Sequence, residues 1–119
     1  GQVPLYQQLA RAAKSLNRRG NVGLVVGATN PEQLEAVRSA CPGMVLLIPG
    51  VGAQGGDLEA AVRLGTDRRG RLAIINASRS VIYASPGSDF AQAARNEAVR
   101  LRDSINQILA GEGNPWPLS

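Results

Sequence analysis

Three short, uninterrupted apolar runs alternate with helical segments along the chain, and this alternation restricts the possible folds more than any other feature. The runs lie at residues 22–26, 44–48 and 72–75. Strands that are apolar at every position need cover on both faces, as in a parallel sheet flanked by helices. The sequence therefore predicts an α/β fold built from repeated βα units.

Helical spacing of apolar residues predicts four helices, at residues 4–17, 31–40, 57–65 and 88–109. Asn30 and Asp57 precede two of them and are expected to cap the free amides of the first turn. The first helix carries an apolar stripe of Leu5, Leu9, Ala12, Ala13 and Leu16. The last carries a stripe of Phe90, Ala94, Leu101, Ile105 and Leu109. Both helices are therefore expected to bury one face.

Three strands are few for a parallel sheet, because both edges would leave backbone groups unpaired. The first helix also has no strand before it in the chain. We therefore expect residues 1–119 to be the back part of a larger βα barrel whose front half is absent. Residues 110–119 are expected to form a C-terminal tail.

The composition excludes several kinds of site. The chain has no histidine and a single cysteine, Cys41, so an internal disulfide is impossible and neither a zinc site nor a Ser-His-Asp triad is expected. Cys41 has no histidine to activate it and is expected to be a buried or half-buried apolar residue. No apolar stretch is long enough for a membrane span, and no signal peptide is visible, which favours a cytoplasmic location.

The net charge of +4 raises the question of nucleic-acid binding. The arginines on helical segments are spaced among acids, which is typical of solvated faces, and aromatic residues are scarce. Only residues 68–71 hold a cluster, in a turn, and Lys14 is expected to be solvated. We therefore expect no nucleic-acid partner. The helical arginines with this pattern are Arg11, Arg38, Arg63, Arg95, Arg100 and Arg102.

A glycine-rich loop, PGVGAQGGD at residues 49–57, follows the second apolar run. A phosphate dianion is held well by backbone amides that can approach closely, together with a guanidinium fork. Gln54 is the long polar side chain in the loop, and Arg79 follows the third run. Residues 80–85 could form the short extra helix of a barrel phosphate site. The alternative is a tight turn and an arginine paired with a neighbouring acid.

The same loop formally matches the dinucleotide-binding pattern G-x-G-x-x-G through Gly50, Gly52 and Gly55. About 20 residues further on, that fold needs an acid for the ribose hydroxyl. The chain has Ile74, Ile75 and Asn76 there instead, so a dinucleotide site is not favoured.

Three segments of the chain resemble the back half of orotidine 5'-phosphate decarboxylase. They are residues 23–29 (GLVVGAT), 46–57 (LLIPGVGAQGGD) and 75–79 (INASR). The resemblance implies the C-terminal half of a TIM (β/α)8 barrel, strands six to eight with helices five to eight. It also implies conversion of orotidine monophosphate to uridine monophosphate and CO2, in pyrimidine biosynthesis, without metal or organic cofactor.

The resemblance also assigns roles to residues of the glycine loop and of the segment after the third strand. Gln54 would bind the 5'-phosphate and lie over the pyrimidine, and Arg79 would grip the phosphate. Pro49 and Val51 would shape the wall near the base, while Gly52 and Gly55 would let the loop close. Many relatives have a glycine before the arginine, where Ala77 and Ser78 stand here; Ser78 is kept as a candidate phosphate contact.

The family's chemistry depends on an alternating array of aspartates and lysines, and this chain contains no such Asp-x-Lys pattern. We therefore expect no catalytic residue in this chain, and inactivity without the N-terminal half of the barrel as partner. The resemblance implies that the whole enzyme is a homodimer. Two alternatives remain open: another phosphosugar-binding barrel enzyme, such as an epimerase or synthase, and a noncatalytic half-barrel that associates with itself.

Overall fold

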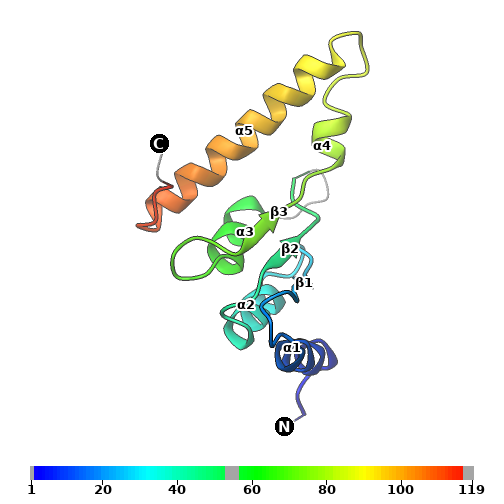
Figure 1. The fold of residues 1–119 in the computed structure, drawn as a ribbon. Coiled ribbons are helices and arrows are strands. Elements are labelled where there is room, and N and C mark those ends of the chain that lie inside the picture. Colours follow the sequence, from blue (N-terminus) through cyan, green and yellow to red (C-terminus); the bar gives the residue numbers. More distant parts are fainter. Residues whose placement is uncertain (1, 53–56, 117–119) are drawn as a thin grey trace.

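The computed structural model describes residues 2–52 and 57–116, and helices alternate with strands along them (Figure 1). The order is α1 (Leu5–Leu16), β1 (Leu24–Val25), α2 (Pro31–Ala40), β2 (Leu46–Ile48), α3 (Leu58–Gly65), β3 (Ala73–Ile75), α4 (Arg79–Ile82) and α5 (Phe90–Gly111). Every predicted helix and strand is present. The short extra turn expected at residues 80–85 is present in part, as the four-residue helix α4, which begins one residue earlier and ends at Ile82.

The three strands form one parallel sheet in the order β1-β2-β3. Leu24 of β1 pairs with Leu46 of β2, and Leu46 pairs with Ala73 of β3. Each strand is followed by a helix, and strands that are consecutive in the chain are neighbours in the sheet. The predicted α/β class with a parallel sheet is confirmed.

Two helix starts follow from the residues that cap them. The Asn30 side chain accepts a hydrogen bond from the Gln33 amide at 3.3 Å, and Pro31 occupies the first helical position of α2. The Asp57 carboxylate accepts bonds from the amides of Glu59 and Ala60, at 2.8 and 3.3 Å. Both predicted caps are confirmed, and each satisfies amides that have no partner within the helix.

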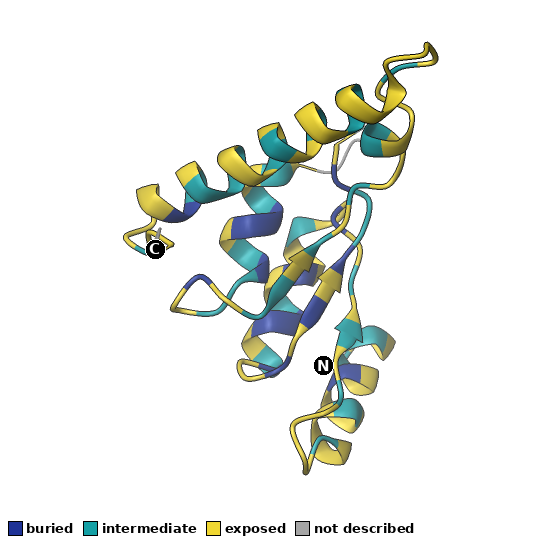
Figure 2. Ribbon diagram, turned by 45° about the horizontal axis from the view of Figure 1, so that its top comes forward, coloured by how far each residue is buried: buried dark blue, intermediate teal, exposed yellow. Residues whose placement is uncertain are grey.

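The core lies between one face of the sheet and the helices α2 and α3 (Figure 2). Leu46 and Ile48 of β2 are fully buried there. They belong to the same buried cluster as Leu34 of α2. Cys41 is in this cluster too and is fully buried, in agreement with the expectation. This layer buries the apolar area that stabilises the fold.

The opposite face of the sheet is apolar and exposed. Val25, Leu47 and Ile74 stand side by side in the strand register, and they are 70%, 36% and 56% exposed. The sequence predicted cover on both faces of the strands, and within the described residues only one face has it. The strands alternate between buried and exposed positions because successive side chains point to opposite faces.

Helix α1 packs through a different face from the predicted one. Leu5, Leu9 and Leu16 are 60–73% exposed. Ala10 is buried, and its carbonyl oxygen accepts a hydrogen bond from the Cys41 thiol at 3.4 Å. The small Ala10 lets α1 approach α2 closely, so the leucine stripe faces away from the described core. The prediction that this stripe is buried is wrong for the described residues.

Helix α5 runs diagonally past the sheet and contacts α3 and α4 (Figure 1). Its stripe is only partly buried: Leu109 is 2% exposed, whereas Phe90 at the other end is 61% exposed. After the helix, the Asn114 amide donates to the Leu109 carbonyl at 2.9 Å. Trp116 stacks under the Arg71 guanidinium, 5.9 Å from the ring centroid, so the described part of the tail packs back onto the fold.

Arg38 is buried, contrary to the prediction of a solvated face. Its exposure is 8%, and its guanidinium donates hydrogen bonds to five carbonyl oxygens that lie before β2, before β3 and at the end of α3. Nε donates to Gly65 at 2.8 Å and Nη2 to Leu72 at 2.9 Å. Nη1 donates to Met44 at 2.7 Å, to Cys41 at 3.1 Å and to Pro42 at 3.5 Å. A guanidinium group is planar and its N–H groups point in several directions, so it suits carbonyl acceptors that lie on several sides of it.

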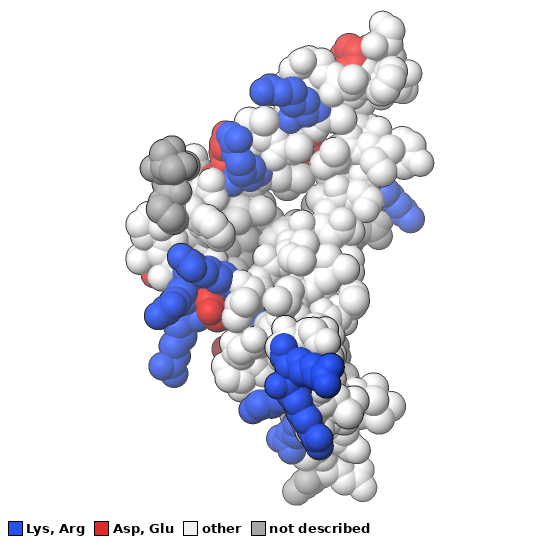
Figure 3. Space-filling view, viewed as in Figure 1, with Lys and Arg blue, Asp and Glu red and all other residues white. Residues whose placement is uncertain are grey.

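Burial lowers the pKa of the Arg38 guanidinium from its usual value, and the nearby Asp67 carboxylate opposes that shift. The remaining helical arginines are exposed, as predicted, and three of them form surface ion pairs. Lys and Arg side chains lie in several separate groups on the face shown in Figure 3. The ion-paired arginines are Arg63, Arg100 and Arg102.

Candidate functional site

The loops that follow the three strands meet at the carboxyl edge of the sheet. The Ala28 amide, after β1, donates to the Pro49 carbonyl at 2.9 Å, and the Asn76 amide, after β3, donates to the Ile48 carbonyl at 3.0 Å. These two hydrogen bonds continue the parallel pairing of β2 with its neighbours beyond the carboxyl ends of β1 and β3. In open parallel sheets, ligands bind outside this edge.

Two positions near the start of the glycine loop have backbone angles that favour glycine. Gly50 and Gly52 have φ angles of 88° and 85°, in the left-handed region that side chains disfavour. A β-carbon on Gly50 would lie 3.9 Å from the Ala28 amide nitrogen, and one on Gly52 would lie 3.7 Å from Ser80 Oγ. The loop after β2 thus touches the segments after β1 and β3.

The other predicted residues of this loop have different surroundings. Val51 is 3% exposed and belongs to the core cluster, whereas Pro49 is half-buried. Gln54 and Gly55 lie outside the described residues. The roles that the resemblance gives these four residues stay predictions.

Arg79 opens helix α4 directly after β3. Its side chain is exposed, and its carbonyl accepts the Tyr83 amide at 2.9 Å. Ser78 precedes it and is also exposed, and its hydroxyl accepts a hydrogen bond from Asn76 Nδ2 at 3.3 Å. The glycine loop and the arginine therefore lie at the same edge, with Ser80 in contact with Gly52.

Ser80 is the residue near this edge that sequence reasoning missed. Its Oγ is buried and has no hydrogen-bond partner, the sole such side-chain atom among the described residues. The sequence placed it in a short turn after Arg79, but nothing in the sequence indicated that its hydroxyl would point inward.

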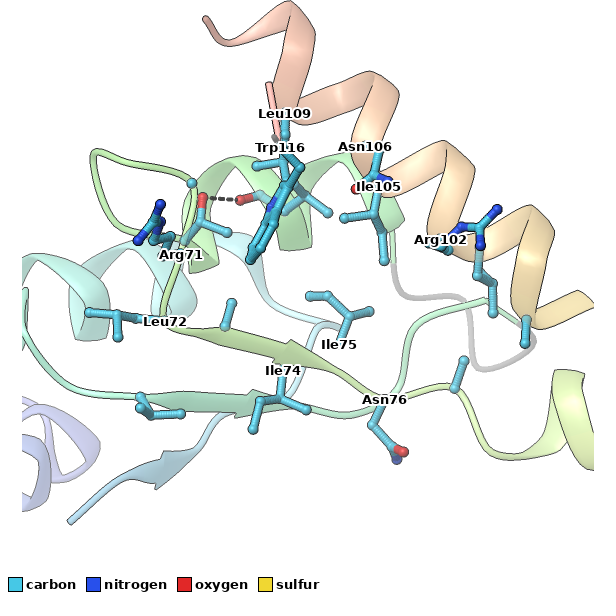
Figure 4. Close-up of a pocket in the computed structure, with 18 of the residues that line it drawn as sticks. Arg71, Leu72, Ile74, Ile75, Asn76, Arg102, Ile105, Asn106, Leu109 and Trp116 are labelled. Carbon is cyan, nitrogen blue, oxygen red and sulfur yellow. Dashed lines mark hydrogen bonds between the residues drawn. The ribbon is translucent and has the colours of Figure 1, made fainter. Parts of the chain in front are cut away.

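A cavity of about 750 Å³ lies elsewhere, between β3 and α5 (Figure 4). Figure 4 shows Ile75 and Leu72 on the strand side, Ile105 on the helix side and Trp116 closing one end. Arg71 and Arg102 are among the lining residues, but the lining is mostly apolar and includes no described residue of the glycine loop. The cavity is therefore distinct from the edge where the glycine loop meets α4.

Within the described parts of the chain, no three side chains of histidine, cysteine, aspartate or glutamate are grouped so as to hold a metal ion. No described helix is both long enough and apolar enough to cross a membrane.

The fold and this edge define a parallel α/β protein with a glycine-rich loop and an arginine where its strands end. The sequence model of the orotidine 5'-phosphate decarboxylase / HUMPS family matches residues 2–95. The chain belongs to that family.

Individual relatives agree with the family match. The chain is 55% identical over 107 residues to orotidine 5'-phosphate decarboxylase from Roseiflexus castenholzii, and 57% identical over 111 residues to the one from Polaromonas naphthalenivorans. These alignments cover 89% and 92% of this chain but 39% of each relative. The chain thus spans about two fifths of the length of the curated relatives it matches.

Solved structures have the same local fold. The Leishmania donovani OMP decarboxylase superposes with a TM-score of 0.74 at 38% identity, over 91% of this chain and 40% of that one. The Leishmania donovani UMP synthase superposes with a TM-score of 0.72 at 38% identity, over 88% of this chain and 23% of that one. The arrangement of helices around this sheet is therefore shared with proteins of known structure.

Proposed function

We propose that this chain is the phosphate-binding part of an orotidine 5'-phosphate decarboxylase, the enzyme that converts orotidine monophosphate to uridine monophosphate and CO2 in pyrimidine biosynthesis. The observation that carries the proposal is the 55–57% identity to relatives of that name over about nine tenths of the chain. The alternative of an epimerase or synthase has no such support.

The 5'-phosphate of the nucleotide is assigned to the edge where the glycine loop meets α4. Gly50 and Gly52 give the loop a backbone without β-carbons, and Arg79 supplies a guanidinium at the same edge. Backbone amides and a guanidinium fork are the groups that bind phosphate best. Gln54 and Gly55 complete this assignment by resemblance.

Contacts to the phosphate act far from the bond that breaks. Their binding energy holds the substrate in position and favours the closed form of the site, which raises the rate at a remote carbon. The aspartate and lysine array that would carry out the chemistry is assigned to the rest of the polypeptide, since this chain has one lysine, Lys14, exposed on α1.

The chain is further assigned to strands six to eight of a (β/α)8 barrel, with helices five to eight. Two features support this: the exposed apolar row of Val25, Leu47 and Ile74, and the apolar cavity beside the free edge of β3. A barrel places one sheet face inside a packed interior and leaves no free edge. The front half of the barrel is therefore proposed as the structural partner, within a cytoplasmic homodimer.

The test is Arg79→Ala in the complete polypeptide that contains this chain. A bidentate guanidinium contact to phosphate comprises two charged hydrogen bonds of about 1.5–3 kcal/mol each, so kcat/KM for orotidine monophosphate should fall roughly 100-fold or more. Arg95→Ala, an exposed arginine on α5, is the matched control and should retain activity. A change of about twofold or less in Arg79→Ala would contradict the assignment.

A further inference from the structure

The Ser80 hydroxyl has an unusual environment. Its Oγ is buried, yet no donor or acceptor among the described residues reaches it. A hydroxyl that loses water without gaining a partner costs about 1–3 kcal/mol. Such atoms are rare in folded proteins and often mark a place where a ligand or an ion completes the bonding.

The position of Ser80 identifies which kind of ligand fits. Ser80 follows Arg79 in α4, and its Oγ faces Gly52, 3.7 Å from the place where a β-carbon would stand. A β-carbon on Gly52 would be in ordinary van der Waals contact with the hydroxyl, and the φ angle of 85° disfavours a side chain there. The hydroxyl is thus held at the contact between the glycine loop and the segment that carries the arginine.

The chemistry of the neighbours points to an anion. The guanidinium of Arg79, the preceding residue, is a donor without acceptor capacity, and the backbone amide of Gly52 is a donor as well. A hydroxyl among donors is best satisfied by donating its own proton to an oxygen that has several lone pairs. Phosphate oxygens meet that requirement, because each accepts more than one hydrogen bond.

We propose that Ser80 donates a hydrogen bond to an oxygen of the nucleotide phosphate and is a phosphate-binding residue of the site. The proposal rests on the proposed function, since it uses the phosphate assigned there. Ser80 differs from Ser78 in this respect, because the Ser78 hydroxyl is exposed and already accepts from Asn76.

The experiment measures dissociation constants by isothermal titration calorimetry with the complete polypeptide that contains this chain. Uridine monophosphate, inorganic phosphate and uridine are the three probes. Ser80→Ala should weaken binding of the first two about tenfold and leave uridine unchanged, because one charged hydrogen bond is lost. The matched control is Ser39→Ala, an exposed serine on α2 that should bind all three probes normally.

The melting temperature without ligand separates a binding role from a structural one. A hydroxyl that has no partner in the ligand-free protein has nothing to lose, so Ser80→Ala should melt at the same temperature or higher. A drop of several degrees would show that the hydroxyl has a structural partner and would overturn the proposal. Equal weakening of uridine binding would overturn it too.

Arg79→Ala distinguishes this proposal from the one on which it rests. If Arg79→Ala weakens binding of uridine monophosphate strongly and Ser80→Ala leaves it within twofold, the phosphate site stands and the role of Ser80 is refuted. If neither substitution changes the affinity for uridine monophosphate, both the site and the role of Ser80 are refuted.

Discussion

Replacing Arg38 with methionine should destabilise the fold more than any other single arginine substitution on the helices. Methionine keeps an unbranched apolar stem, but it ends short of the guanidinium and donates no hydrogen bond. The Arg38 guanidinium holds carbonyls of Gly65, Met44 and Leu72, which belong to three separate segments. Its removal takes the charged donor from the buried Gly65 and Met44 carbonyls, whereas the Leu72 carbonyl keeps the bond from the Leu46 amide at 2.9 Å.

The magnitude follows from the contacts. Four bonds at 2.7–3.1 Å, each from a charged donor, stabilise by about 1.5–3 kcal/mol apiece before the cost of burial is subtracted. Taking the guanidinium out of water offsets several kcal/mol of that. The expected loss is about 3–5 kcal/mol, because the buried Gly65 and Met44 carbonyls each lose their donor at about 1–3 kcal/mol apiece.

Urea unfolding of the complete polypeptide, followed by circular dichroism, measures the free energy of unfolding. Arg38→Lys keeps the positive charge, but a lysine ammonium lacks the planar guanidinium fork and cannot donate to acceptors on both sides at once. Its free energy of unfolding should therefore fall by at least about 2 kcal/mol. Arg95→Met, on the exposed face of α5, is the control and should change stability by less than about 0.5 kcal/mol. An Arg38→Met variant within about 1 kcal/mol of the parent would refute the reasoning.

Two further predictions concern local packing and charge. Gly23→Ala should lower the free energy of unfolding by about 1–3 kcal/mol, because the added β-carbon would lie 2.8 Å from the backbone carbonyl oxygen of Val45. Gly43→Ala is the control, since Gly43 has open space around it. This variant should match the parent in the same urea titration. The hydrogen bond from Arg100 lowers the pKa of Glu97. Arg100→Gln should therefore raise that pKa toward its usual value in an NMR titration, and an unchanged pKa would exclude this cause.

The order of elements could be predicted from the sequence because it depends on local signals. Apolar runs of four or five residues mark strands, and Asn30 and Asp57 cap the helices that their positions indicate. The glycine loop and Arg79 could be assigned to one edge of the sheet, since strands in a parallel sheet all end at the same side. These predictions need no knowledge of which surfaces touch.

The failures concern tertiary contacts, which periodicity does not specify. Arg38 has the same sequence surroundings as a surface arginine, and only the positions of the carbonyls around it distinguish the two. Helix α1 packs by the small face around Ala10, whereas hydrophobicity alone favoured the leucine stripe of Leu5, Leu9 and Leu16. Ser80 was missed for the same reason, because its inward direction depends on the contact with Gly52.

The exposed apolar face of the sheet bears on how the chain functions. An apolar side chain that faces solvent on a strand does not contribute the roughly 1.5–3 kcal/mol that its burial would add to stability. Each of the three strands has such a side chain, namely Val25, Leu47 and Ile74. Such a row becomes favourable if the sheet curves around further strands, whose inward side chains would cover it. The same closure would bring residues of those strands to the carboxyl edge, beside the glycine loop and Arg79, where the proposed reaction needs them.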